Sequence, residues 1–297
     1  MPNMALLEKL RQCERYQKAP SWQKPFIAPG RFLHNQLAKR AQPVSGEVRH
    51  VDAFHYPQFA IVNGEIVSEQ LAFYGYFEAD LTEAIIRLVR PGDIAVDIGM
   101  HLGYYTSLLA QLVGPQGQVH SFEPTPSTRE LAARNVSKFS NITVHSFAMW
   151  SEKTELPFKD YGLKWLAFNS FSKARLEEEP AKPREYQVQT TTLDNFRSSL
   201  RKPIAFVKID AESAEHAIIK GAKSLLKQDA PVLSLELGDF HQDQASRAII
   251  EELSSVGYSA WELNGGRFVR HTPRADYDYC NLIFATEARA ATWNQPS

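Results

Sequence analysis

Three groups of residues in the 297-residue sequence combine side chains that can bind a charged ligand or move a proton. The first is the glycine-containing segment 97–106 (DIGMHLGYYT), the second is the Phe-Glu-Pro sequence at 122–124, and the third is the acidic segment 208–215 (KIDAESAE). Each follows or ends a short apolar run of the kind that forms a buried strand. Ligands of parallel sheets bind at the carboxyl ends of the strands, so we expect the three groups to lie together.

The glycine-containing segment favours S-adenosylmethionine over a dinucleotide as its ligand. Glycines let the backbone turn sharply and let a ligand approach without meeting a Cβ. A dinucleotide loop requires Gly-x-Gly-x-x-Gly, whose middle glycine makes room for the pyrophosphate. That position is His101 here, and Asp97 would repel the phosphates. A ligand with an ammonium and a sulfonium group suits Asp97 better, and a nicotinamide-dependent oxidoreductase remains the alternative.

The acidic residue after the second predicted strand supports an adenosine-containing ligand. Glu123 stands where a carboxylate accepts hydrogen bonds from both ribose hydroxyls, in nicotinamide and S-adenosylmethionine sites alike. Asp97 and Glu123 could instead be ordinary helix caps, since carboxylates are common at that position.

The third group supplies the candidate catalytic residues, Asp210 and Glu212. Alternate residues of a strand point to the same side, so both can face one cavity. Neighbouring carboxylates tend to raise one pKa, which suits a general base. Asp210 could instead contact the methionine end of the cofactor, and Asp210 or Ser213 could cap the next helix. Glu236 with Asp210 is the obvious pair for a divalent cation, but two carboxylates make an incomplete site and we predict no metal ligands.

These residues need a framework, and from residue 80 onward the sequence alternates between strand and helix patterns. The predicted strands are 94–98, 118–122, 142–147, 205–209, 232–237, 258–263 and 281–285, and the predicted helices are 80–89, 102–113, 127–139 (with a capping box at 127–130), 214–226 and 246–255. Such alternation builds a parallel sheet covered by helices on both faces. We therefore predict an α/β fold.

Two regions depart from this alternation. Residues 1–72 are predicted to form an arm packed on the body, with an amphipathic helix near the start, covered aromatic residues such as Trp22 and Phe26, and a hairpin over 59–67. Residues 151–184 are predicted to be an inserted polar loop that includes the solvated run Glu177–Glu179. The alternating residues 186–192 that follow are predicted to form an edge strand.

In combination, the three motifs resemble the FkbM family of S-adenosylmethionine-dependent methyltransferases. The resemblance covers about residues 74–237, with the motifs in the same order, and includes the Thr-Thr-Leu-Asp sequence at 191–194. It implies the seven-stranded class I methyltransferase sheet, Rossmann-like, with the last strand antiparallel and residues 73–297 as the catalytic domain. Two positions depart from the family pattern: Met100-His101 replaces Ala-Asn, and Ser213 replaces Gly.

The resemblance also implies a set of site residues. Those predicted to bind the cofactor are Glu78, Asp97, Gly99, His101, Gly103, Thr106, Glu123, Ala148 and Asp210, and those predicted to act in catalysis are Asp210 and Glu212. Glu78 precedes the first helix of the domain and could close over the amino-acid end of the cofactor. His101 either bonds the cofactor's carboxylate or occupies the space of the family's Asn.

The reaction implied by the resemblance is transfer of a methyl group to a hydroxyl of a sugar or small-molecule natural product. A nitrogen acceptor is the alternative within the same mechanism, and no motif identifies the acceptor itself. One further possibility is a binding module that keeps the cofactor pocket without turnover, for which Ser213 is the single hint.

The amino-acid composition limits the classes of partner that we expect this chain to bind. Thirty-three Lys and Arg residues balance 34 Asp and Glu, a net charge of −1, so the whole chain has no field that would hold a nucleic acid or a membrane, although a local patch is compatible with this. The two cysteines, Cys13 and Cys280, form no disulfide framework, and the start of the chain has no secretory signal pattern. We therefore expect a cytoplasmic protein without nucleic-acid or membrane partners and leave its oligomeric state open.

Overall fold

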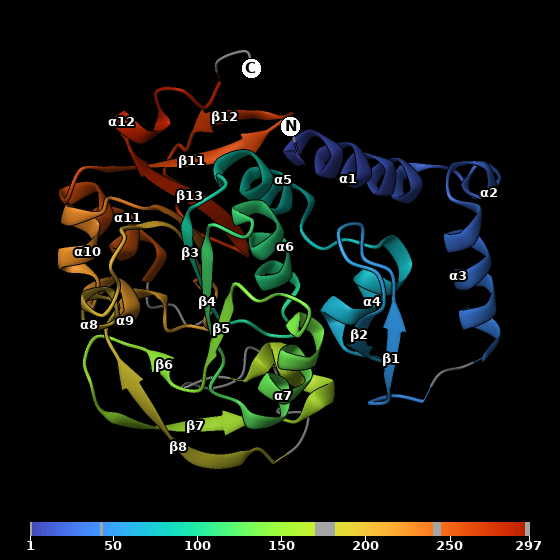
Figure 1. Cartoon of the computed structure of the whole chain (residues 1–297), viewed down its shortest axis with the longest axis horizontal. Coiled ribbons are helices and arrows are strands. Elements are labelled where there is room, and N and C mark those ends of the chain that lie inside the picture. The colour runs from blue at the N-terminus through green and yellow to red at the C-terminus, as the bar shows by residue number, and fades with distance from the viewer. Residues whose placement is uncertain (1, 42–43, 170–181, 240–244, 295–297) are drawn as a thin grey trace.

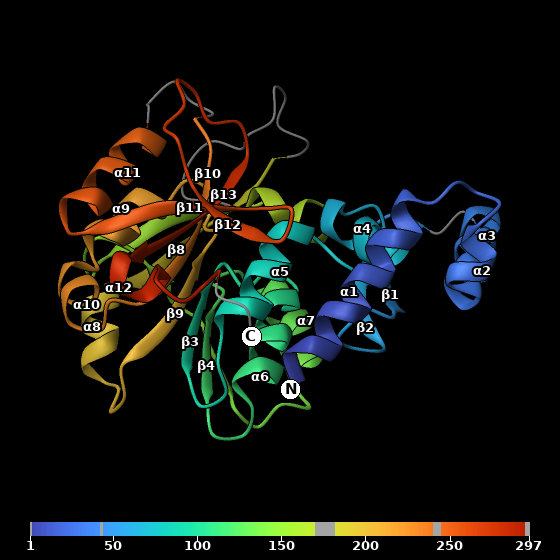
Figure 2. The ribbon, with the colours of Figure 1, turned by 90° about the horizontal axis from the view of Figure 1, so that it is seen from above.

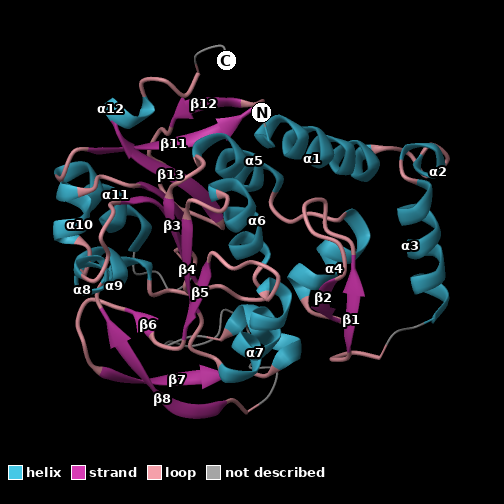
Figure 3. Ribbon diagram, in the orientation of Figure 1, coloured by secondary structure: helices cyan, strands magenta, loops and turns pink. Residues whose placement is uncertain are grey.

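The computed structural model describes residues 2–41, 44–169, 182–239 and 245–294, and within them the central sheet has eight strands (Figures 1 and 3). Their order across the sheet is β12 (Arg267–Arg270), β11 (Tyr258–Asn264), β13 (Cys280–Thr286), β10 (Val232–Leu237), β9 (Ile204–Ile209), β3 (Ile94–Ile98), β4 (Gln118–Phe122) and β5 (Ile142–His145). The strands from β10 to β5 are parallel, and β13 is antiparallel to β10, as predicted. The predicted count of seven misses β12, a short strand that pairs antiparallel with β11.

Helices cover both faces of this sheet (Figure 2). They are α1 (Pro2–Lys18), α2 (Lys24–Ile27), α3 (Pro29–Ala41), α4 (Ile66–Tyr74), α5 (Ala79–Leu88), α6 (Tyr104–Val113), α7 (Pro126–Val136), α8 (Leu193–Ser198), α9 (Glu215–Lys220), α10 (Lys223–Gln228), α11 (Ala245–Ser255) and α12 (Glu287–Ala290), with a 3-10 helix η1 at Leu163–Phe168. Strand β3 shows the two-sided burial directly, since Ala95 belongs to the core under α5 and α6 and Val96 to the core under α9, α10 and α11. None of the described helices is long and apolar enough to cross a membrane.

The predicted hairpin over 59–67 is wrong. Strand β2 (Phe59–Val62) pairs antiparallel with the preceding strand β1 (Val48–Val51), and the chain then enters helix α4. The carboxylate of Glu65 accepts hydrogen bonds from the backbone N–H groups of Val67 and Ser68, at 3.0 and 2.7 Å. This buried helix cap outweighs the Asn-Gly turn signal.

The N-terminal arm contacts the body through α1. Leu7 and Leu10 belong to the same core as α5, and the Asn3 amide donates to the Ile86 carbonyl oxygen. The proposed boundary between residues 72 and 73 falls inside helix α4. The expected cover over the aromatic residues is absent in the described part of the chain, because Trp22 is 70% exposed and Phe26 83% exposed.

The region predicted as a polar insertion contributes strand β7 (Glu155–Asp160) to a second, smaller sheet. Strand β8 (Arg184–Thr191) pairs antiparallel with β7 and parallel with β6 (Ala148–Met149). The alternating segment at 186–192 therefore lies in this small sheet and is not an edge of the central one. The run Glu177–Glu179 lies outside the described residues.

Two helix predictions also need correction. The helix predicted over 214–226 is divided near Gly221 into α9 and α10, because a Cβ at Gly221 would lie 2.3 Å from the Trp150 carbonyl oxygen and the close approach requires this glycine. Helix α7 begins at Pro126 with Thr125 at its N-cap, so the capping box predicted at 127–130 is not formed. Proline is favoured at the first helical position.

Candidate active site

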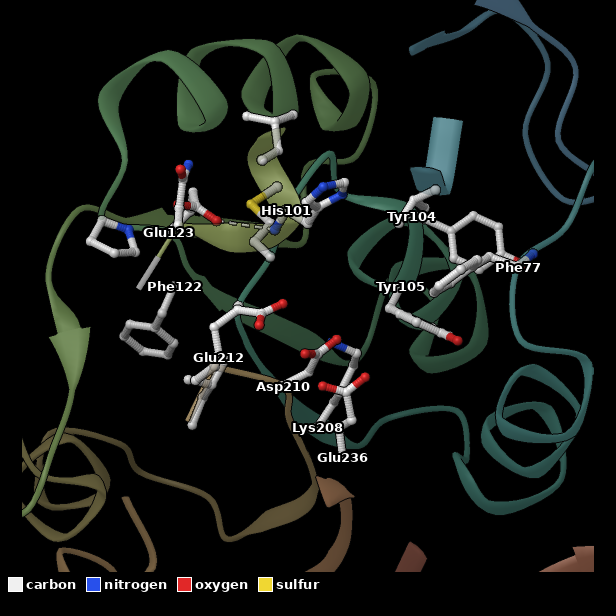
Figure 4. A pocket seen from close by; sticks show the side chains of 18 of the residues that line it. Phe77, His101, Tyr104, Tyr105, Phe122, Glu123, Lys208, Asp210, Glu212 and Glu236 are labelled. Carbon is white, nitrogen blue, oxygen red and sulfur yellow. Dashed lines mark hydrogen bonds and ion pairs between the residues drawn. The ribbon is translucent and has the colours of Figure 1, made fainter. Parts of the chain in front are cut away.

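A cavity of about 520 Å³ lies at the carboxyl ends of β3, β4, β9 and β10 (Figure 4). A volume of this size suits a small-molecule ligand. Helix α4 and residues 77–78 close one side of the cavity, and β6, β7 and η1 contribute to another. The three groups of chemically active residues found in the sequence therefore do converge.

Glu123 is held in the cavity wall by two backbone donors. Its Oε2 accepts from the N–H of His101 at 3.1 Å, and its Oε1 accepts from the N–H of Thr125 at 3.0 Å (Figure 4). The side chain is only 7% exposed. Burial raises the pKa of Glu123 to about 7, while the hydrogen bonds from Thr125 and His101 oppose the shift.

His101 links the glycine loop to the N-terminal segment. Its backbone has a left-handed φ of +50°, and its Nε2 lies 3.6 Å from Oε1 of Glu65, the buried cap of α4. The side chain lines the cavity and is partly exposed, so both readings of His101 remain compatible with its place. The 3.6 Å contact exceeds hydrogen-bond distance, so only a charged imidazole would form an ion pair with Glu65 and join the loop to α4.

Gly99 stands where strands β3 and β9 meet. Its φ is +80°, and a Cβ at this position would lie 1.7 Å from the carbonyl oxygen of Asp210. The sequence suggested that this glycine admits a ligand, but the structure shows a closer constraint, the backbone of the neighbouring strand end. No side chain fits there without displacing that backbone.

Asp97 lies behind the cavity wall. It is fully buried, its Oδ2 accepts from the Thr106 hydroxyl at 2.6 Å, and its Oδ1 lies 3.6 Å from the Lys208 ammonium. Burial raises the pKa of Asp97, and the charge of Lys208 opposes this. Asp97 thus holds the side chains of Thr106 and Lys208 in place behind the cavity lining.

Lys208 is the buried cation of the site, and sequence reasoning gave it no role. Its ammonium donates to Oδ2 of Asp210 at 3.2 Å and lies 5.0 Å from the centre of the Tyr105 ring. Burial lowers the pKa of Lys208, but the carboxylates of Asp210, Asp97 and Glu78 outweigh it and the net shift is upward. Lys208 therefore stays charged and balances the carboxylates around it.

Glu78 belongs to the same charged cluster around Lys208. Its carboxylate accepts from the Tyr105 hydroxyl at 2.7 Å and from the Asn281 amide. Burial, and then the negative charge of Asp210, raise the pKa of Glu78. The residue has a left-handed φ of +42°, a conformation that is uncommon outside glycine and marks a position worth inspection.

Three carboxylates gather beyond the end of β9. The carboxylate oxygens of Asp210, Glu212 and Glu236 lie within 4.8 Å of one another, and all three side chains line the cavity (Figure 4). The sequence predicted that Asp210 and Glu212 face one cavity and indicated Asp210 with Glu236 as a cation-binding pair, and the structure brings all three together. These oxygens have the chemistry of Mg²⁺ ligands, but three carboxylates alone do not identify a metal centre.

The predicted site residues divide into two sets. Those that line the cavity are Glu78, Gly99, His101, Glu123, Ala148, Asp210 and Glu212, and those that lie behind its lining are Asp97, Gly103 and Thr106. Sequence reasoning missed the apolar wall made by residues such as Phe158 and Leu166, because β7 and η1 were taken for a loop. It also missed Tyr279, whose distance in the chain from the motifs gives no local signal.

S-adenosylmethionine fits this donor set. The buried carboxylate of Glu123 lies in the cavity lining, where it can accept hydrogen bonds from a ribose. The carboxylate of Glu78 also belongs to the lining and can complement an ammonium group. Phe122 and Met149 supply apolar surface close to Glu123 for an adenine ring. The cavity's acidic lining is incompatible with a pyrophosphate.

Comparisons with known proteins agree with this geometry. The model of the "Methyltransferase FkbM domain" matches residues 97–260, and that of protein-L-isoaspartate (D-aspartate) O-methyltransferase matches residues 42–148. A "Protein-L-isoaspartate O-methyltransferase" of Ignicoccus hospitalis is 34% identical over 127 residues, which are 40% of this chain and 56% of that protein. One from Methanothrix thermoacetophila is 34% identical over 58 residues, 19% of this chain and 28% of that protein. The chain thus spans about half or less of the curated relatives it matches.

Similar solved structures include a "Methyltransferase FkbM" from Methylobacillus flagellatus KT, with 16% identity, a TM-score of 0.41 and coverage of 72% of this chain and 52% of that one. The FkbM domain match spans more than half of the 297 residues and includes all three motifs at the cavity. It removes the nicotinamide-dependent oxidoreductase as an alternative. The chain belongs to the FkbM family of methyltransferase domains.

Proposed function

We propose that this methyltransferase acts on a hydroxyl group of a neutral small molecule or sugar, with Asp210 as the group that receives the hydroxyl proton. The observation that carries the proposal is the cluster of Asp210, Glu212 and Glu236 at one side of the cavity. Bound S-adenosylmethionine supplies an electrophilic methyl group. An alcohol must lose its proton at or near the transition state, and a carboxylate at the cavity surface can accept it.

The cluster argues against an anionic acceptor. Its three carboxylates, from Asp210, Glu212 and Glu236, all line the cavity and lie within 4.8 Å of one another. An isoaspartyl carboxylate or an RNA phosphate would meet like charge in a site of low dielectric constant. The similarity to protein-L-isoaspartate O-methyltransferases is therefore better explained by a shared cofactor-binding region than by a shared methyl acceptor.

The cofactor-binding roles are part of the same proposal. Glu123 would hold the ribose, Gly99 and His101 would border the amino-acid end, and Glu78 would complement the ammonium. Ala148 at the start of β6 would border the adenine side. Asp97, Gly103 and Thr106 would act indirectly, by fixing the loop and strand that carry these groups.

The rest of the cavity wall is apolar, which indicates what kind of acceptor molecule would fit beside it. Phe158 and Leu166 come from β7 and η1, and Ile66 and Val67 come from α4. Ile66 is 59% exposed although it lines the cavity, so it stands at the mouth. An acceptor with an apolar body next to its hydroxyl would cover these side chains on binding.

The proposal is tested by mass spectrometry of methyl transfer from S-adenosylmethionine to three acceptor sets: hydroxyl-bearing glycosides and phenols, amines, and an isoaspartyl peptide. We expect transfer to a neutral hydroxyl and none to the peptide carboxylate. Methylation of the isoaspartyl peptide at a faster rate than any hydroxyl would refute the proposal. Transfer to amines alone would support the nitrogen alternative.

A further inference from the structure

The edge of the molecule formed by α2, α3 and the turn before them exposes large apolar side chains. Trp22 is 70% exposed, Phe26 83%, Leu33 59% and Leu37 56%. We call residues 22–37 the α2–α3 edge. Exposed aromatic and aliphatic side chains on consecutive segments usually mark an interaction surface.

This edge projects from the catalytic body. In both views α2 and α3 lie at the side of the molecule opposite α8, α10 and α11 (Figures 1 and 2). The inner face of α3 is fixed by Asn35, whose amide donates to the Tyr16 hydroxyl at 3.1 Å and to the Phe73 carbonyl oxygen at 3.0 Å. Leu33 and Leu37 are one helical turn apart and stand nearly opposite Asn35 around the helix. Their exposure is therefore a consequence of how α3 is anchored.

The same region carries a strong local charge. Residues 1–41 contain eight Lys and Arg residues and two Glu residues, a net charge of +6 in a chain whose total is −1. The two acidic groups are already paired, Glu8 with Arg15 and Glu14 with Lys18. Of the six remaining cations, Arg11 lies 3.9 Å from Glu83 of the body. The excess of basic residues in the arm nevertheless favours contact with anionic surfaces.

We propose that the α2–α3 edge binds the surface of an anionic lipid bilayer, with Trp22, Phe26, Leu33 and Leu37 entering the interfacial region. Basic residues add electrostatic attraction to anionic lipid headgroups, and Trp, Phe and Leu contribute burial at the boundary with the acyl chains. Such a contact is peripheral, with the apolar side chains lying in the plane of the interface. It revises the expectation, drawn from the net charge of the whole chain, that no membrane is involved.

Two other occupants fit less well. Single-stranded nucleic acids are bound by basic grooves and aromatic stacking, but Leu33 and Leu37 can neither stack on a base nor form hydrogen bonds. A symmetric pair of copies would bring two arms of charge +6 together, which like-charge repulsion opposes. An anionic bilayer is complementary to both the apolar side chains and the basic residues of this surface.

The test is sedimentation of the full chain with vesicles of phosphatidylcholine alone and of equimolar phosphatidylcholine and phosphatidylglycerol. We expect binding to the anionic vesicles that weakens with added salt, and a loss of about tenfold or more in the double variant Trp22→Ser/Phe26→Ser. The variant Leu33→Gln/Leu37→Gln provides an independent second measurement. The control is Val269→Ser, which removes an exposed apolar side chain (42% exposed) from β12, outside the arm, and should bind as the unsubstituted chain does.

Three results would overturn the proposal. The first is no more binding to anionic vesicles than to phosphatidylcholine alone, and the second is undiminished binding of both double variants. The third is that the double variants still bind vesicles but no longer form a dimer in light scattering, or no longer bind a single-stranded RNA. Either result would assign the α2–α3 edge to another partner. Circular dichroism and the thermal shift with S-adenosylhomocysteine should be unchanged in every variant, because the substituted side chains are exposed and distant in sequence from the cavity.

Discussion

The two walls of the cavity are built on different principles. The wall formed by the ends of β3 and β4 is fixed by the backbone: the N–H groups of Gly99 and Met100 both donate to the Phe122 carbonyl oxygen, and that of His101 donates to Glu123. The wall formed by the ends of β9 and β10 is a concentration of charge, in which three carboxylates lie within 4.8 Å of one another. The first wall suits a cofactor of constant shape.

The second wall is distinguished by the like charges that it keeps together. Left-handed backbone conformations occur in both walls, at His101 in the first wall and at two residues in the second. Glu212 and Ser213 have left-handed φ angles of +49° and +79°. Such conformations cost free energy in residues other than glycine and persist only where the surrounding structure imposes them. The comparison suggests that the β3–β4 wall provides binding and the β9–β10 wall provides chemistry, and four predictions test that division.

The largest effect is expected where the two walls touch. Gly99→Ala would place a Cβ 1.7 Å from the Asp210 carbonyl oxygen at a φ of +80°. We expect the free energy of unfolding to fall by about 3 kcal/mol or more, because backbone and not a flexible side chain must move. Urea denaturation measures this.

The matched control is Gly92→Ala, which has a φ of +90° but no atom within 4 Å of the added Cβ. It should cost only about 1–2 kcal/mol, the penalty of the left-handed conformation alone. Equal losses in the two variants would show that the walls are not in contact at Gly99.

The second prediction separates chemistry from binding. Asp210→Asn removes the negative charge while keeping the shape, so turnover should fall by about a hundredfold or more if Asp210 accepts the proton. Affinity for S-adenosylhomocysteine, measured by calorimetry, should be largely retained. The control Glu130→Gln alters an exposed carboxylate on α7 and should change neither quantity.

A different outcome would move Asp210 to the other wall. If affinity falls and turnover at saturating cofactor does not, Asp210 is a cofactor-binding residue, the role that its place beside Gly99 also allows. The proposed division, with binding at the β3–β4 wall and chemistry at the β9–β10 wall, would then be wrong for Asp210.

The third prediction concerns the pH dependence of cofactor binding at the β3–β4 wall. The pKa of Glu123 is raised to about 7, and its ionised form is the better acceptor for ribose hydroxyls. Affinity for S-adenosylhomocysteine should therefore fall by about tenfold between about pH 8 and pH 6, as the carboxylate becomes protonated. Glu123→Gln should bind weakly at both pH values and lose this dependence.

The raised pKa of Glu123 makes the stability of the ligand-free protein depend on pH in the opposite direction to cofactor affinity. A raised pKa means that the folded state binds the proton more tightly, so the stabilisation is complete below the ordinary value of 4.5 and is lost as pH rises through about 7. Thermal unfolding without ligand should show this loss in the unsubstituted chain and not in Glu123→Gln. If affinity and stability moved in the same direction with pH, Glu123 would not be the group that titrates.

Much of the fold and the cofactor wall could be predicted because the signals are local. The strands at 94–98 and 118–122 are short apolar runs, and Glu123 follows the second one directly. Parallel pairing of these strands then brings Glu123 to the glycine loop without further information. The resemblance of the motifs to a family added the expectation of a seven-stranded sheet with an antiparallel last strand.

The rest of the site depends on contacts between distant residues, for which the sequence has no local signal. Glu78 bonds to Asn281, 203 residues away in the chain, and His101 faces Glu65, which the hairpin prediction had placed in a strand. The charge balance around Lys208 likewise requires Asp97 and Asp210 to be adjacent in space. Tertiary packing decides these arrangements, not local propensity.

The smallest predicted effect tests whether the strain of the β9–β10 wall is needed. Ser213, where the family pattern has glycine, is exposed and has a φ of +79°, a conformation that glycine adopts without a steric penalty. Ser213→Gly should therefore raise the free energy of unfolding by roughly 1 kcal/mol, with turnover unchanged, because no packed side chain is lost. Urea denaturation and an initial-rate assay measure the two quantities. A stabilised variant with lower turnover would instead mean that the serine hydroxyl takes part in the chemistry, and the contrast between a binding wall and a chemical wall would extend to the position where this chain departs from its family.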